Sequence, residues 1–249
     1  MMNNFRNLLI VSIFTILYIT ATAENRFHAS MAVGAGFATG TFQQTDPLSI
    51  EAGFAQQGFT MNFDGDYYLH NRVALSARLH FGQASINEDA AFNWLKTKTA
   101  DYYPIGDSVR TENGYWQWTS PMLGLKVNYP LILNKLYIEG SIYSGLSVTS
   151  NPQHYLRIID EENKKEVISE NVQDKHYSIP LMFDGGLRMK LNNQLQIRLY
   201  GSVYRSKSTY QHLIYSSSQA SESTQLIGDF EVHKKISTLN IYAGIIYVL

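Results

Sequence analysis

Cysteine is absent from the 249 residues of the chain. A disulfide framework and an acylated lipoprotein anchor are therefore excluded, because each requires a cysteine. An excess of one charge is missing too, since 20 Lys and Arg stand against 21 Asp and Glu. This balance provides no bulk field for a polyanion, so we expect no nucleic-acid partner. After residue 23 the chain also lacks an apolar run of the roughly 20 residues that a transmembrane helix needs.

The first 23 residues have the three-part layout of a secretory signal. Arg6 supplies the positive start, the apolar run from Leu8 to Ile19 follows, and Ala21-Thr22-Ala23 offers a small-x-small cleavage site. A retained membrane anchor is the alternative, which the short run and the cleavage site disfavour. We therefore expect residues 1–23 to be a signal peptide and residues 24–249 to form one exported domain.

Period-two alternation of apolar residues with polar or small residues recurs along the mature chain. This period is that of a strand whose two faces meet different surroundings. It predicts eight strands, which begin near Phe27, Phe59, Arg72, Met122, Leu136, Ile179, Leu195 and Leu239. Short turns at His70-Asn71, Pro130 to Asn134 and Asn192-Asn193 alternate with four long loops, which places every long loop at one end. This layout predicts an all-β fold, an eight-stranded antiparallel up-and-down transmembrane β-barrel.

Alternation alone does not say which face is outside, because a soluble barrel or sandwich would turn the apolar face inward. The polar face is rich in glycine, which makes room inside a narrow barrel. Its charges are mixed in sign and could pair across a filled lumen. A solvated face with unpaired charges is the alternative. The expected lumen charge network consists of Asp64, Asp66, Arg72, Arg78, Lys126, Glu139, Asp184, Arg188 and Arg198.

Aromatic residues gather near the expected strand ends, as they do in the girdles of membrane barrels. An aromatic core cluster would give a similar pattern. Trp116 and Trp118 have the opposite parity to the apolar Leu123 and Leu125. A bulge or register change near Pro121 would bring these indoles to the outer face, and we expect one there.

The signal, the eight alternating strands and the segment Tyr242–Leu249 at the end of the last strand resemble the small outer-membrane barrel families. These are the OmpA transmembrane domain, OmpX, OmpW and, more loosely, the porin-family barrel domain. The resemblance covers the whole mature chain and rests on layout, with leucine rather than an aromatic residue in last place. It implies a protein of the bacterial outer membrane in contact with its lipids. We expect the protein to be a monomer.

The long loops carry the functional expectation. Two segments predict hairpins that extend beyond the membrane, and in OmpX-like barrels such hairpins engage external partners. The loop candidates for binding an extracellular protein or surface are Tyr155, Arg157, Ile159, Tyr210 and Tyr215. Loops that merely shield the barrel mouth are the alternative. The sequence thus predicts a structural or surface-interaction role.

Two other functions remain open at this point: a narrow channel for ions or small solutes, and a lipid-modifying hydrolase at the rim that would use His176 or His233. The seven histidines are scattered without metal-ligand spacing, and no hydrolase signature is present. We therefore expect no catalytic residues, no metal and no cofactor.

Overall fold

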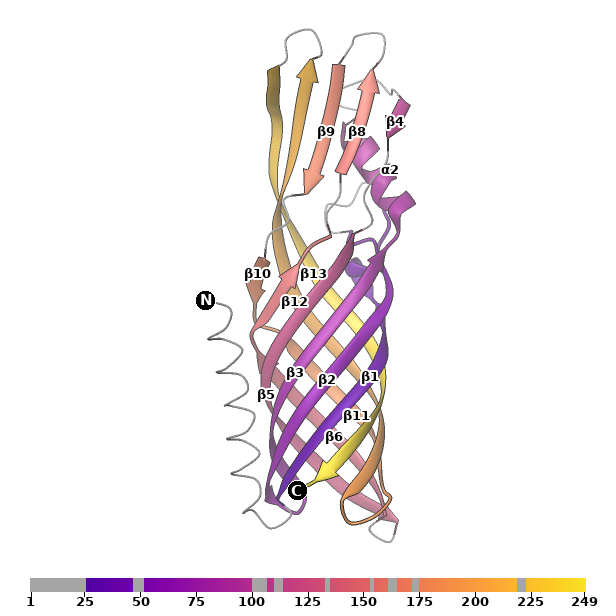
Figure 1. The fold of residues 1–249 in the computed structure, drawn as a ribbon, viewed down its shortest axis with the longest axis vertical. Helices are drawn as coiled ribbons and strands as arrows, with labels where there is room; N and C mark the ends of the chain where they lie inside the picture. Colours follow the sequence, from indigo (N-terminus) through magenta and orange to yellow (C-terminus); the bar gives the residue numbers. More distant parts are fainter. Residues whose placement is uncertain are drawn as a thin grey trace, which may run out of the picture.

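The computed structural model describes residues 26–46, 52–99, 107–109, 114–132, 135–152, 155–160, 165–171, 175–218 and 223–249. The expected signal peptide lies outside these residues. Eight antiparallel strands close into a ring, in the order β1-β2-β3-β5-β6-β11-β12-β13 and back to β1 (Figure 1). They are β1 (Phe27–Ala38), β2 (Ala55–His70), β3 (Val73–Ile86), β5 (Tyr115–Ile132), β6 (Leu136–Gly145), β11 (Leu181–Lys190), β12 (Leu195–Ser218) and β13 (Ser223–Val248). The eight-stranded antiparallel barrel predicted from the alternation is confirmed.

The two ends of the barrel differ. Short connections between β2 and β3, β5 and β6, and β11 and β12 share one end with the start of β1 and the end of β13, where His28 pairs with Val248. At the other end, β12 and β13 continue past the barrel as a long hairpin that stays paired through Ser218 and Ser223 (Figure 1). We call these the short-turn end and the outer end.

Further elements extend the outer end. β9 (Lys165–Asn171) pairs with β12 beyond the barrel, β8 (Tyr155–Asp160) pairs with β9, and β4 (Asp107–Val109) forms the edge. β7 (Ser147–Ser150) and β10 (Lys175–Ser178) pair with each other along the rim. The helix α2 (Glu88–Thr99) begins after Asn87, whose side-chain Oδ1 accepts the Ala90 amide at 3.1 Å, the usual role of an N-cap residue.

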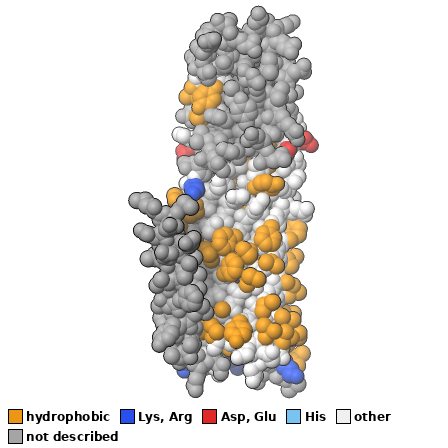
Figure 2. Space-filling model, in the orientation of Figure 1, with side chains coloured by type: hydrophobic (Ala, Val, Ile, Leu, Met, Phe, Trp, Pro, Cys, Tyr) orange, Lys and Arg blue, Asp and Glu red, His pale blue; other side chains and the backbone are white. Residues whose placement is uncertain are grey.

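Burial in the barrel is the reverse of that in a soluble protein. Large apolar side chains cover the outside, whereas polar and charged side chains fill the interior. Figure 2 shows the apolar side chains as a broad belt around the visible face, with basic side chains at the lower end. The belt includes Met31, Val33, Phe63, Leu75, Leu79, Leu123, Leu125, Ile142, Leu187, Leu199, Ile241 and Ile245. Such an exterior is stable only against hydrocarbon, which identifies the lipid-facing side.

Among the described residues, no helix is both long enough and apolar enough to cross a bilayer.

Interior glycines lie directly across from interior aromatic rings. Gly82 pairs with Trp118, and a Cβ on Gly82 would fall 2.1 Å from the Trp118 ring. Gly124 pairs with Tyr143 in the same way, with its Cβ position 2.5 Å from that ring. The small residues of the polar face therefore make room for large rings that cross the narrow lumen.

The expected bulge near Pro121 is wrong. β3 and β5 pair in unbroken register from Tyr115 to Val127, and both Trp116 and Trp118 are buried inside the barrel. Their parity needs no correction, because small residues face both indoles: Gly82 lies opposite Trp118 and Ala84 opposite Trp116. The expected aromatic girdle is found only in part. The exposed tyrosines are Tyr67, Tyr115, Tyr129 and Tyr177, whereas Tyr68, Tyr204 and Tyr210 are buried inside.

Candidate functional site

The middle of the lumen is organised around one carboxylate on β2. Asp64 Oδ1 accepts Arg78 Nε at 2.7 Å, and its Oδ2 accepts Arg78 Nη2 at 3.0 Å and Arg198 Nη2 at 2.6 Å. The Ser30 hydroxyl adds a donor at 3.3 Å. Strands β1, β2, β3 and β12 are thereby joined across the interior through one buried acid.

Two further pairs complete this layer. Asp184 on β11 accepts Arg78 Nη1 at 2.6 Å, and Asp66 accepts Lys126 Nζ at 2.6 Å. The layer thus holds three carboxylates and three cations, with every charge within contact distance of an opposite one. Low dielectric strengthens such pairing and makes any unpaired member costly. The structure therefore brings six of the nine sequence-selected charges into one neutral cluster.

The other three selected charges lie elsewhere. Arg72 is not in the lumen: it lies exposed in the turn after β2, with its guanidinium 5.2 Å from the centre of the Tyr129 ring. It stands at the strand end, where a long side chain can reach water. Glu139 is buried, but its Oε2 has no hydrogen-bond partner. Arg188 is buried near the short-turn end, where it donates to the Tyr68 hydroxyl at 2.8 Å.

The first loop folds into the outer mouth of the barrel and closes it. Phe42, in the short helix η1 (Gly40–Phe42), is fully buried with its ring centre 5.5 Å from that of Trp116. Trp116 Nε1 donates to the Gly53 carbonyl at 3.0 Å, and Lys234 Nζ donates to the Ala52 carbonyl. Sequence reasoning missed this plug, although an aromatic residue in a Gly- and Thr-rich loop is a signal that could have revealed it.

Below the plug, aromatic and amide groups continue the filling of the lumen. Trp118 Nε1 donates to His80 Nε2 at 2.9 Å, and His80 Nδ1 lies 2.8 Å from Asn62 Oδ1. Trp118 also stacks on Tyr204, with ring centres 5.9 Å apart. Paired polar groups and stacked rings therefore fill the interior between the plug and the charged layer.

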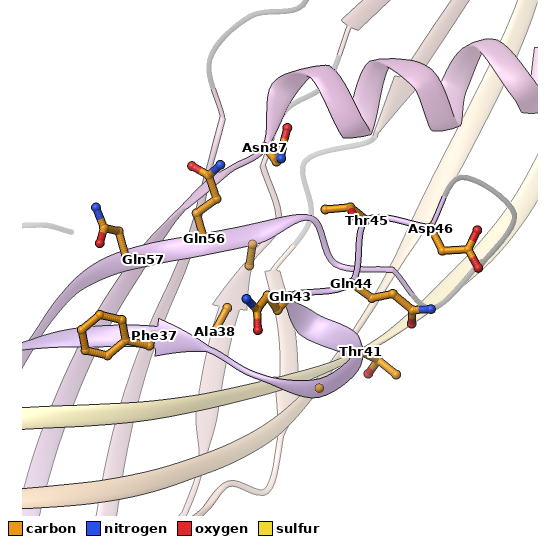
Figure 3. Close-up of a pocket in the computed structure, with 12 residues that line it drawn as sticks. Phe37, Ala38, Thr41, Gln43, Gln44, Thr45, Asp46, Gln56, Gln57 and Asn87 are labelled. Atoms are coloured by element: carbon orange, nitrogen blue, oxygen red, sulfur yellow. The ribbon is translucent and has the colours of Figure 1, made fainter.

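A polar pocket of about 1240 Å³ opens beside the plug at the outer end. It is formed by the end of β1, the first loop, the start of β2 and the N-terminus of α2. Figure 3 shows carboxamide side chains around it, and they belong to Gln43, Gln44, Gln56, Gln57 and Asn87. An amide both donates and accepts hydrogen bonds, so this rim pocket can satisfy a polar ligand without a net charge on the ligand. Sequence reasoning missed it, although two Gln-Gln pairs flanking one loop are visible in the sequence.

The loop candidates divide into two groups. Tyr155, Arg157 and Ile159 lie on β8, in the expected hairpin with β9, and their side chains are outside the described residues. Tyr210 does not face outward: it is buried and meets Trp116 edge-on, with ring centres 6.1 Å apart. Tyr210 keeps the inward parity of Tyr204 because β12 continues unbroken past the barrel, so it supports the plug. Tyr215 is partly exposed at a register shift of β12.

The histidines considered for hydrolysis form no catalytic arrangement among the described residues. His176 and Ser178 lie on β10, but the Ser178 hydroxyl is 2.7 Å from that of Ser206. His233 is exposed, 3.0 Å from the Thr209 hydroxyl. Within the described ranges, no group of three His, Asp or Glu side chains could hold a metal ion.

Comparison with known proteins finds similarity in structure only. No family model matches the chain, and no curated protein is significantly similar in sequence. Neisserial surface protein A is 8% identical with a TM-score of 0.41, covering 90% of this chain and 97% of its own. A major outer membrane protein from Thermus thermophilus is 13% identical with a TM-score of 0.48, covering 90% and 99%. Ail, the attachment invasion locus protein of Yersinia pestis, is 12% identical with a TM-score of 0.34, covering 88% and 97%.

The architecture itself gives the assignment that these distant similarities do not. A closed antiparallel ring with an apolar belt outside and paired charges inside satisfies every condition for crossing a bilayer with strands. The chain is a transmembrane β-barrel of the outer-membrane type.

Proposed function

We propose that the protein acts at the cell surface, by binding an extracellular partner with the extended outer end of its barrel. The observation that carries the proposal is the asymmetry of the molecule. Strands β12 and β13 run well past the barrel and form one sheet with β9, β8 and β4, whereas the other end has only short turns. A sheet that projects from a membrane presents side chains and a strand edge to partners outside.

The rim pocket adds chemistry to this surface. Its five carboxamide side chains lie together with the hydroxyls of Thr41 and Thr45 around one opening. Several convergent groups that donate and accept hydrogen bonds are the usual means of orienting a polar ligand. Asp46 also lines the opening, so the pocket combines amides, hydroxyls and one carboxyl group, and it supports the binding of a polar ligand at the outer end.

The filled lumen favours surface binding over conduction. A channel would need an open path, yet Asp64, Arg78 and Lys126 are buried in mutual contact and Phe42 closes the outer mouth. The hydrolase alternative has less support, because Ser178 is engaged by Ser206 rather than by a histidine.

The test is a deletion that removes β8 and β9 from the projecting sheet and leaves the barrel. Residues 155–171 comprise β8 and β9; β9 pairs with β12 only beyond the barrel wall, and β8 pairs with β9 and β4. A variant with a short Gly-Ser turn in their place should fold and reach the membrane, since the eight-strand ring is intact. Adherence of bacteria displaying it to epithelial cells and to arrayed glycans should fall to the level of cells without the protein.

A matched variant separates the pocket from the projecting sheet. Gln57→Ala combined with Gln43→Ala removes two amides of the rim pocket and keeps the hairpins. A partial loss of adherence is expected from this variant. A deletion variant that folds and adheres as the wild type does would refute the proposal.

A further inference from the structure

The short-turn end of the barrel contains a second cavity, far from the outer end. It has a volume of about 1030 Å³ and opens between the turns. Four cationic side chains line it, and no Asp or Glu is among its described lining residues. These cations are Arg26, Arg72, Arg188 and Lys190. Because the chain as a whole is nearly neutral, this gathering of one sign is local.

Arg188 is the buried member of the group. Its side chain belongs to β11, is only 5% exposed, and lies 4.5 Å from the centre of the Tyr137 ring. Its Nη1 donates to the Tyr68 hydroxyl at 2.8 Å, but its Nε has no hydrogen-bond partner. A neutral hydroxyl and a ring face compensate a guanidinium only in part.

The cations in the middle layer of the lumen differ from Arg188 in their partners. There, Arg78, Lys126 and Arg198 each contact a carboxylate at 2.6 or 2.7 Å. Of the ion pairs formed by the described residues, none includes Arg188. The buried Glu139 lies on the neighbouring strand β6, opposite Gly186, but forms no ion pair with Arg188. A buried cation that contacts no carboxylate is costly, so a cavity that opens beside it suits an anion from outside the chain.

We propose that this short-turn mouth binds a phosphate group, with Arg188 at its base and Arg26, Arg72 and Lys190 around its entrance. A guanidinium fork matches the geometry of phosphate oxygens, and the surrounding cations raise the local anion concentration. The phosphate could come from a free anion or from the headgroup of a lipid in the adjoining leaflet. Both sources present the same chemistry to the cavity.

The test uses the whole barrel in a detergent and in bilayers that carry no phosphate. In octyl glucoside, inorganic phosphate is titrated while the side-chain Nε–H resonance of Arg188 is followed by NMR. In nanodiscs of digalactosyldiacylglycerol, the same resonance is compared with and without phosphatidylglycerol. A saturable shift with inorganic phosphate supports a free-anion site, and a shift only with phosphatidylglycerol supports a headgroup site.

Variants test which residue is responsible. Arg188→Met should weaken the binding of whichever probe causes the shift, inorganic phosphate or phosphatidylglycerol, roughly tenfold or more, as expected for loss of a charge-assisted hydrogen bond. Arg205→Met is the matched control, because Arg205 is exposed on β12 away from the cavity, and it should bind as the wild type does. If Arg188→Met fails to fold, Lys190→Met at the entrance replaces it, with a smaller expected loss. If neither inorganic phosphate nor phosphatidylglycerol causes a shift, or if binding is unchanged in the variants, the proposal is overturned.

Discussion

Asp64→Asn replaces a single side-chain oxygen by an NH2 group, and we expect it to lower the stability of the barrel strongly. The Asp64 side chain is fully buried and accepts three hydrogen bonds from two guanidinium groups. Its replacement leaves Arg78, Arg198 and Lys126 facing only Asp66 and Asp184, an excess of one positive charge in the layer. Breaking a buried pair in this way costs about 3–5 kcal/mol. We expect a loss of that size in the free energy of unfolding.

The assay is denaturant unfolding in lipid vesicles, followed by tryptophan fluorescence, because the indoles of Trp116 and Trp118 are buried in the lumen. Glu231→Gln is the control: its carboxylate is exposed and lies 3.8 Å from His233, so its loss should cost at most about 1 kcal/mol. The double variant Asp64→Asn with Arg198→Met restores two charges of each sign. It should regain about 1 kcal/mol or more relative to Asp64→Asn alone. Equal stabilities for Asp64→Asn and Glu231→Gln would refute the account of the lumen.

Three further predictions concern packing, orientation and conduction. Gly82→Ala should destabilise the barrel by about 1–3 kcal/mol in the same unfolding assay, because its Cβ would overlap Trp118; Gly185→Ala, which meets nothing within 4 Å, should not. Leu123→Arg should cost about 2–4 kcal/mol in vesicles, since that exposed leucine faces hydrocarbon; a neutral effect would mean that it faces water. Planar-bilayer recordings should show no conductance steps in the wild type, and regular steps would contradict a filled lumen.

Most of the barrel was predictable because a strand offers only two faces. The parity of residues such as Leu123 and Leu125 placed them outside, and the parity of Asp64 and Arg78 placed them inside. The same rule, followed consistently, would have placed Trp116, Trp118 and Tyr210 inside as well. The expectation of a bulge failed because it assigned the two indoles to an outer aromatic girdle, whereas Gly82 leaves space for Trp118 inside the lumen.

The parity of strand residues does not predict how loops pack, because loop sequences do not alternate. The burial of Phe42 depends on the first loop turning inward, which is decided by contacts with strands distant in sequence. The rim pocket likewise joins Gln43 and Gln57 with Asn87, residues from three separate segments. The prediction for Arg72 failed for a simpler reason: Arg72 lies in the turn between β2 and β3, where the parity of a strand does not apply.

Gel mobility decides whether this chain is a closed membrane barrel with its apolar side outward. A closed barrel keeps its hydrogen-bonded ring in detergent until it is heated. The protein extracted from the outer-membrane fraction should therefore migrate differently with and without boiling. Identical mobility, together with recovery of the protein from the soluble periplasmic fraction, would contradict the account and turn the charged face outward to water.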